Sequence, residues 1–169
     1  ELATALKKLQ MIDCCNGPEA GQHNFFRGGD LKVYEDQTLK ALKTLENRLP
    51  VKQLKNIWDT CTSKKYTEKN VWVHGDIAPG NILIQNNSFH GIIDFGILGT
   101  GDPACDYAMA WTYFNKEARK IFLANLPSDM INRAKGWALW KALITYDDEN
   151  IDFKQNARHT INVILNEEL

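Results

Sequence analysis

The sequence predicts an α+β domain that is mostly helical and carries its unusual polar residues on a small β insertion. Apolar side chains recur at helical spacing before residue 62 and again after residue 102. Between these parts, three short runs of branched apolar residues are separated by turn residues, which is typical of strands. A mainly helical chain with one β insertion favours this class over a doubly wound sheet.

The N-terminal part is predicted to form a short helix and then a loop. Residues 2–12 place Leu2, Leu6 and Leu9 at i, i+4 and i+7, which puts them on one face of an amphipathic helix. The passage GPEAGQHNFFRGGD, residues 17–30, is rich in glycine and polar residues and is expected to be irregular.

Two further helices are expected before residue 62. Asp36 is a candidate N-cap for a helix over 37–49, whose four leucines share one face and which Pro50 ends. A second apolar face runs from Val51 to Cys61 and indicates another helix.

The β insertion consists of VWV (71–73), ILI (82–84) and HGIID (90–94), which are short, branched and apolar, as expected of buried strands. The turn residues QNNS (85–88) lie between the last two runs. These two strands are therefore predicted to form a hairpin.

The C-terminal part is predicted to hold two more helices. After the glycine-bearing loop 96–101, Asp102 precedes a proline, which is a strong helix start, and this helix is expected to reach about Tyr113. Ser128 is a candidate cap for a last long helix to about Tyr146. Its segment WALWKALI is apolar nearly all round and is therefore expected to be buried.

The composition is that of an ordinary globular protein and excludes two classes of partner. Of 169 residues, 44% are hydrophobic and 24% are charged. A formal net charge of −1 provides no long-range positive field, which argues against nucleic-acid and membrane-surface binding. No apolar run approaches the roughly 18 residues that span a bilayer. The four cysteines show no metal-ligand spacing and indicate free thiols in a reducing cytoplasm.

The residues that carry chemistry lie between positions 74 and 106, in the segments HGDIAPGN, IDFG and GDPACD. Asp76 follows one strand and precedes Asn81 by five positions, and Asp94 comes thirteen residues after Asn81, at the end of another strand. A phosphoryl-transfer site needs one carboxylate to orient the attacking hydroxyl and hard oxygen ligands to hold Mg²⁺. Asp76 suits the first task, and Asn81 with Asp94 suits the second.

A D-x-x-x-x-N loop, a hairpin and DFG together form the pattern of protein kinases. The glycine that follows His74, where protein kinases have arginine, instead resembles the aminoglycoside/choline phosphotransferase family, as does GDPACDYAMAWTYF. The segments NFFRGGDLKVYEDQT and KGWALWKALITY are similar to a bacterial branch of that family. The resemblance extends from about residue 17 to 146. It implies the C-terminal lobe of a protein-kinase-like fold.

The resemblance also implies roles for individual residues. Asp76 would be the catalytic base, and Asn81 and Asp94 would bind Mg²⁺ and so help to hold ATP or GTP. His74 and Asp106 would brace the loop by hydrogen bonds. From the residues alone, however, His74 is more simply a packed histidine, and Asp106 also suits the first turn of a helix. The sequence departs from the family at position 78, where many relatives carry histidine in place of alanine.

Three other interpretations of the motifs fit less well. GDIAPGN lacks the lysine and hydroxyl residue of a Walker A loop, and GILGTGDP lacks the glycine spacing of a dinucleotide loop. A metal-dependent hydrolase using His74 and Asp76 would need further ligands at suitable spacing, which the other histidines do not offer.

Near the C-terminus, Asp147, Asp148 and Glu149 form an acidic run. Such a run is usually a solvated face, but it also suits a cationic substrate such as an aminoglycoside, because carboxylates pair with ammonium groups.

A kinase of this type needs a second lobe, which supplies a sheet, a phosphate-covering loop and a lysine. Nothing before Val71 resembles that sheet, and the first residue is Glu1 rather than Met. Residues 1–169 are therefore expected to be one domain without the N-terminal nucleotide-clamping lobe. Two functions remain open: the catalytic lobe of a small-molecule kinase, or an inactive lobe that binds a nucleotide or a partner. Self-association through the uncovered lobe surface is a further expectation.

Overall fold

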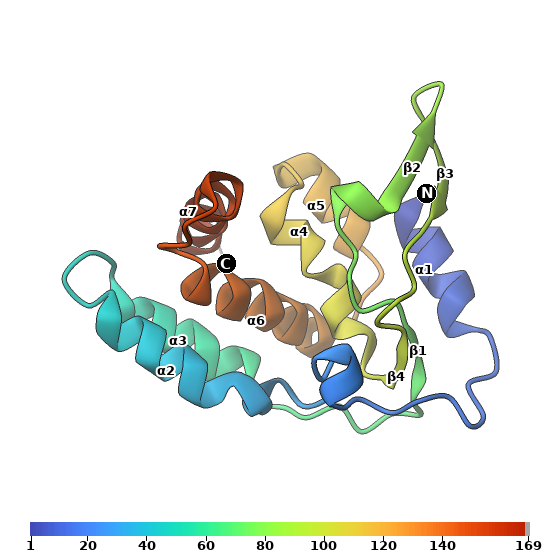
Figure 1. Ribbon diagram of the computed structural model, residues 1–169, viewed down its shortest axis with the longest axis horizontal. Coiled ribbons are helices and arrows are strands. Elements are labelled where there is room, and N and C mark those ends of the chain that lie inside the picture. Colours follow the sequence, from blue (N-terminus) through green and yellow to red (C-terminus); the bar gives the residue numbers. More distant parts are fainter. Residues whose placement is uncertain (168–169) are drawn as a thin grey trace.

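The computed structural model describes residues 1–167 and shows a mostly helical chain with two small antiparallel sheets (Figure 1). The predicted α+β class is therefore confirmed. Among the described residues, no helix combines the length and apolarity needed to cross a membrane.

Helix α6 (Ser128–Ile144) lies at the centre of the helical part, as the sequence predicted for a segment that is apolar nearly all round (Figure 1). It packs against α2 (Glu35–Thr44) and α3 (Val51–Cys61) on one side and against α7 (Ile151–Leu165) on another. Its tryptophans, Trp137 and Trp140, are buried in this core. Other buried side chains of the core include Leu6, Leu42, Leu54, Trp58 and Trp111.

The N-terminal helices differ in detail from the prediction. Helix α1 (Leu2–Gln10) buries Leu2 and Leu6 as expected. Asp36 is not an N-cap, because it lies in the first turn of α2. A 3₁₀ turn, Leu31–Tyr34, precedes that helix and is capped instead by Asp30, whose carboxylate accepts a hydrogen bond from the Lys32 N–H at 2.9 Å.

Helix α2 is also shorter than predicted. It ends at Thr44, and Pro50 directly precedes the first residue of α3 instead of terminating α2. The leucine pattern continued beyond the real helix end because the turn 45–49 still packs on the core through Leu45 and Leu49. The leucine pattern therefore predicted correctly which side chains are buried, but it did not predict where the helix ends.

One sheet pairs β1 (Val71–Val73) with β4 (Gly99–Gly101). Strand β4 is a correction, since 96–101 was expected to be loop. Its sequence Gly-Thr-Gly carries no strand periodicity. The chain is extended there because Gly101 approaches Gly28 so closely that no side chain fits between them, and the Asp102 N–H donates to the Gly28 carbonyl at 2.7 Å.

The predicted hairpin is confirmed and joins β2 (Ile82–Gln85) to β3 (Ser88–Ile92). Its second strand, β3, begins two residues earlier than the predicted 90–94 and ends before Asp94. The turn is Asn86-Asn87, and both residues have positive φ (51° and 61°), as a tight hairpin turn requires. The hairpin projects from the body (Figure 1), and Ile84 is 62% exposed, so the expectation of buried strands is wrong for it.

The region after residue 102 holds more elements than the sequence indicated. Asp102 caps a 3₁₀ helix, Pro103–Tyr107, which is followed by the short α4 (Met109–Thr112) and by α5 (Lys116–Leu123). Ser128 is the first residue of α6 and makes no capping hydrogen bond, so the predicted cap is wrong. Helix α7 was missed, and α6 is not the last helix.

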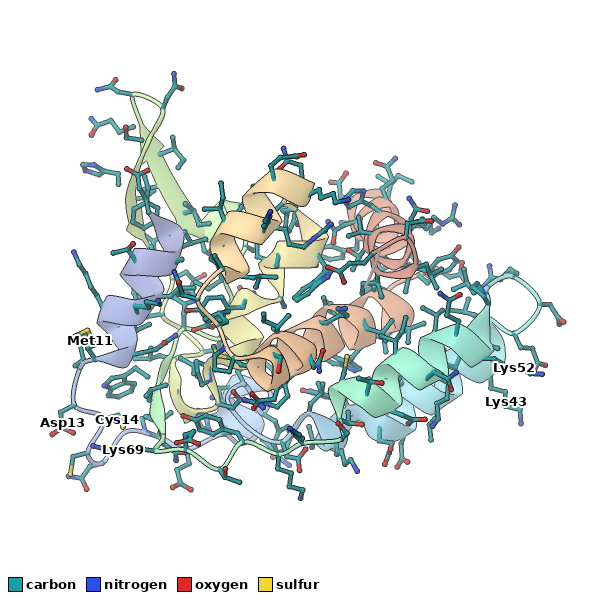
Figure 2. All side chains as sticks on the ribbon, turned by 180° about the vertical axis from the view of Figure 1, so that it is seen from behind. Met11, Asp13, Cys14, Lys43, Lys52 and Lys69 are labelled. Atoms are coloured by element: carbon teal, nitrogen blue, oxygen red, sulfur yellow. The ribbon has the colours of Figure 1, made fainter. Side chains whose placement is uncertain are left out.

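The connection between α1 and the loop lies against the start of β1. Figure 2 shows Met11, Asp13 and Cys14 beside Lys69, on the opposite side of the molecule from Lys43 and Lys52. The Trp72 Nε1–H donates to the Asp13 carbonyl at 3.0 Å. This connection positions β1 and therefore the loop that follows it.

Candidate active site

The loop between β1 and β2 carries Asp76. Gly75 adopts a φ of +84°, which favours glycine, and a Cβ atom there would lie 3.0 Å from the Ile97 carbonyl oxygen and 3.1 Å from Cβ of Arg27. The glycine of HGD is therefore required by the backbone turn and by close packing on both sides.

Asp106, from the 3₁₀ helix after β4, is fully buried beneath this loop. One carboxylate oxygen accepts a hydrogen bond from the His74 N–H at 2.8 Å, and the other accepts from the Gly75 N–H at 2.7 Å. Burial raises the pKa of the Asp106 carboxyl, and these two backbone hydrogen bonds oppose that shift. The loop is thus tied at two consecutive amides to one side chain.

The His74 ring is also fully buried and uses both nitrogens within the protein. Nδ1 accepts from the Asp76 N–H at 3.2 Å, which leaves the hydrogen on Nε2 to be donated to the Ile93 carbonyl at 2.9 Å. The ring therefore joins the Asp76 loop to the residue before Asp94. A hydrolytic metal site at His74 is not supported, because neither nitrogen is left to bind a metal.

Asp76, Asn81 and Asp94 are brought to neighbouring positions at the base of the hairpin. The Asn81 amide donates to the Asp76 carbonyl oxygen at 2.8 Å and to its carboxylate at 3.0 Å. The Ile93 N–H donates to the Asn81 carbonyl at 3.0 Å, so Asp94 follows directly on a residue bonded to Asn81. Asp94 has a φ of +64°, and its carboxylate accepts from the Gly96 N–H at 3.3 Å.

These side chains keep suitable oxygen atoms for a hard cation. The amide nitrogen of Asn81 donates to Asp76, so its Oδ1 remains available to bind a cation. One carboxylate oxygen of Asp94 accepts from the Gly96 N–H, so the other oxygen remains available. Mg²⁺ is commonly held by one or two protein oxygens plus water and substrate phosphate. The described residues contain no cluster of three or more His, Cys, Asp or Glu that would form an all-protein metal cage.

A cavity of about 200 Å³ opens beside Asp76. Its apolar wall includes Met109, Trp137 and Trp140, and Arg27 and Lys141 supply positive charge. The Arg27 guanidinium lies over the rings of Trp137 and Trp140, 4.9 and 5.1 Å from their centroids. Sequence reasoning missed Arg27 and Lys141, because nothing in their local sequence distinguishes them from surface cations.

The acidic run at 147–149 does not line this cavity. Asp147 is ion-paired with Arg48 and lies 4.0 Å from Arg158, and the Arg48 side chain holds the pKa of Asp147 below its usual value. Asp148 accepts a hydrogen bond from the Asn150 N–H at 2.9 Å. These contacts fit the solvated-face interpretation better than the substrate interpretation.

A buried ion pair behind the site was also missed. Arg133 of α6 donates to Asp102 at 2.6 and 3.3 Å, and it also bonds Asp129 at 2.7 Å. Asp102 is therefore both a cap and the partner of a core arginine. Because the capping motif was sufficient to explain Asp102, its ion pair with Arg133 was not predicted from the sequence.

The helical body, the projecting hairpin and the loops at its base are those of a kinase-like fold. The model of the phosphotransferase enzyme family matches residues 1–142, and the chain belongs to that family.

Individual relatives agree with this assignment. An aminoglycoside 3'-phosphotransferase of Enterococcus faecalis is 25% identical over 103 residues, which are 61% of this chain and 39% of that protein. The solved structure of aminoglycoside phosphotransferase APH(2'')-Ib with ADP matches 95% of this chain and 60% of its own, with a TM-score of 0.52 and 22% identity. The streptomycin–ATP complex of APH(2'')-IIa matches 92% of this chain and 57% of its own, with a TM-score of 0.52 and 23% identity. The chain thus spans between about two fifths and three fifths of these relatives.

Proposed function

We propose that this chain is the catalytic lobe of a kinase that transfers the γ-phosphoryl group of ATP or GTP to a hydroxyl group of a small molecule. The observation that carries the proposal is the hydrogen-bonded pair Asp76–Asn81, and Asp94 directly follows Ile93, whose N–H donates to the Asn81 carbonyl. Family membership supports the reaction class, and relatives solved with ADP and with ATP support an adenine nucleotide.

Asp76 is the proposed catalytic base. Its carboxylate is exposed at the mouth of the cavity, where it can accept the hydrogen of an incoming hydroxyl group. The Asn81 amide holds one of its oxygens in a fixed direction. His74 and Asp106 act as positioning residues, because they fix the backbone of the loop without reaching the cavity.

Asn81 and Asp94 are the proposed ligands of Mg²⁺. When bound, the ion would neutralise charge on the transferring phosphates. The protein's contribution is to hold the carboxamide and carboxylate oxygens near Asp76 at the base of the hairpin, so that the phosphates and the accepting hydroxyl meet in one orientation.

The remainder of the enzyme is proposed to be an N-terminal lobe that covers the nucleotide and is not part of residues 1–169. The partial coverage of the relatives supports this proposal. The exposed apolar side chains of the hairpin region, Leu83, Ile84, Ile93 and Phe95, would face that lobe and would allow self-association without it.

Four free thiols fit a reducing cytoplasm.

The test is Asp76→Asn in a chain that includes the N-terminal lobe. The amide keeps the shape but cannot take the hydroxyl proton, and positioned base catalysis supplies about 10²–10⁴-fold. We expect phosphotransfer to fall by that factor, while circular dichroism and the unfolding midpoint stay the same. Asp13→Asn, on the exposed connection after α1, is the matched control. Equal turnover in Asp76→Asn and the native protein would remove Asp76 from the mechanism.

A second candidate function is an inactive lobe that binds a nucleotide or a protein partner. It is favoured by the limited coverage of the relatives. It predicts that no native form of the chain, of any length, transfers phosphate from ATP or GTP.

A further inference from the structure

The cavity beside Asp76 carries the wrong charge for a polycationic substrate. Among the described residues that line it, the charged side chains are Arg27, Lys141 and Asp76. Two of these three are cations, and the carboxylate is the one assigned to catalysis. An aminoglycoside presents several ammonium groups and would need several carboxylates around it.

Neither cation is neutralised by a neighbour. Arg27 donates from Nε to the Gly75 carbonyl at 3.0 Å, and no described carboxylate forms an ion pair with Arg27 or Lys141. Asp148 and Asp76 both contribute a favourable field at Lys141, but Asp148 does not line the cavity, and Asp76 is the carboxylate assigned to catalysis. Although Lys141 as a residue is exposed, its pKa is lowered first by burial and then by the positive charge of Arg27.

Two hydrogen-bond donors of the wall residues also lack acceptors. Nη1 of Arg27 and Nε1 of Trp137 are buried and have no hydrogen-bond partner among the described residues. Both atoms are buried, so a ligand in the cavity would reach them only after a movement of these side chains, and the attraction for an anion comes from the charges of Arg27 and Lys141. The tryptophan rings beside the guanidinium offer an apolar surface to the rest of a ligand.

We propose that the molecule phosphorylated at this site carries an anionic group, a carboxylate or a phosphate, which Arg27 and Lys141 bind while its hydroxyl group lies at Asp76. The position of the hydroxyl rests on the proposed function. The binding of the anion rests on the cavity alone.

The experiment titrates four probes into this chain without nucleotide. D-glycerate and glycerol 3-phosphate are the carboxylate and phosphate probes, glycerol is the neutral control, and kanamycin is the polycation. Affinity is measured by calorimetry, and the indole N–H signals of Trp137 and Trp140 in nitrogen–proton spectra report whether the probe is in the cavity. We expect at least one anion to bind more tightly than glycerol and kanamycin and to shift these two signals. The relative affinities of the two anions decide between carboxylate and phosphate.

Lys141→Gln and Lys141→Glu are the test variants, because Arg27 also holds Gly75 and its replacement would disturb the catalytic loop. Removing one cation should weaken anion binding about fivefold, which is the size of one partly screened ion pair, and the charge reversal should weaken it further. Lys40→Gln, an exposed lysine of α2 with the same change in net charge, is the matched control and should bind as the native chain does.

Three outcomes would overturn the inference. These are tighter binding of kanamycin than of either anion, no binding of either anion, and equal anion affinity in Lys141→Gln and Lys40→Gln. Because no nucleotide is present, anion binding in a chain that never shows phosphotransfer would retain this inference and reject the proposed function. Phosphotransfer to kanamycin with no anion binding would reject this inference and retain the proposed function.

Discussion

At the residue scale, Asp106 is the side chain on which the catalytic loop depends most. It is fully buried, and its two oxygens accept the consecutive amides of His74 and Gly75. In Asp106→Asn, the new amide group must point its own hydrogens at one of these donors, so a backbone N–H in the interior loses its acceptor.

We therefore expect Asp106→Asn to lower the free energy of unfolding by about 2–4 kcal/mol, which is the usual cost of losing a buried hydrogen bond to a charged group. Urea denaturation measures it. Asp59→Asn removes an exposed ion pair with Lys55 and should change the same quantity by less than about 0.5 kcal/mol. Similar effects for both variants would show that the loop does not depend on Asp106.

The cysteines should divide into two classes by reactivity. Burial raises the pKa of the Cys61 thiol to about 12, and it raises that of the fully buried Cys105 as well. A raised pKa leaves less thiolate at a given pH, so at pH 8 only about one Cys61 thiol in 10⁴ is ionised.

Cys15 is exposed and Cys14 is partly so. Labelling with a thiol reagent at pH 8 should modify Cys15 first and Cys14 next, and should reach Cys61 and Cys105 only after denaturation. Mass spectrometry of peptides identifies the sites. Rapid native labelling of Cys61 would contradict the burial of α3 against α6.

At the scale of elements, the contact between α3 and α6 depends on a glycine in the middle of α6. A Cβ atom at Gly136 would clash with the Leu31 side chain and lie 2.9 Å from Cβ of Cys61. Glycine in a helix interior normally costs about 1 kcal/mol relative to alanine, so this close approach is the reason for its presence.

Gly136→Ala should therefore lower the free energy of unfolding by about 1–3 kcal/mol, because the clash separates the helices. This loss is expected to exceed the gain in helix propensity that alanine provides. Gly80→Ala is the matched control, since nothing lies within 4 Å of a Cβ atom there. Thermal unfolding followed by circular dichroism gives both values. A rise in the unfolding temperature for Gly136→Ala would mean that the helices can move apart freely.

At the scale of the whole molecule, residues 1–169 should fold without a second lobe but bind nucleotide weakly. The core around α6 is built from within this chain, through side chains such as Leu42, Trp58, Trp137 and Trp140. Cooperative unfolding is expected for that reason. Without covering groups, the outer phosphates of a nucleotide remain in water, where an ion pair at about 4 Å contributes only about 1 kcal/mol.

Calorimetry with Mg²⁺·ATP and this chain should therefore give a dissociation constant well above the micromolar range, with no turnover. The same titration with a chain that includes the N-terminal lobe is the comparison. Micromolar binding by residues 1–169 would show that they contain a complete nucleotide site.

From the sequence by itself, helices α1, α2, α3 and α6, strand β1, a helical segment after Asp102 and the hairpin could be predicted, and Asp76, Asn81 and Asp94 were proposed as site residues. These features are local: helix faces, turn residues and the D-x-x-x-x-N spacing depend on near neighbours in the chain. Helix α7 was not predicted, because its apolar stripe, of which Ala157, Ile161 and Ile164 are buried, is weak and follows an acidic run.

Only the tertiary structure decided the pairing of β4 with β1, the buried ion pair between Asp102 and Arg133, and the charge of the cavity. Arg27 and Lys141 are separated by more than a hundred residues and reach the same cavity only when the segment before α2 that carries Arg27 packs against α6 and the loop after β1. The acidic run was the only substrate signal that the sequence offered, and Arg48 occupies its first carboxylate. Long-range contacts of this kind have no periodic signature, because they are fixed by packing between elements and not by spacing along the chain.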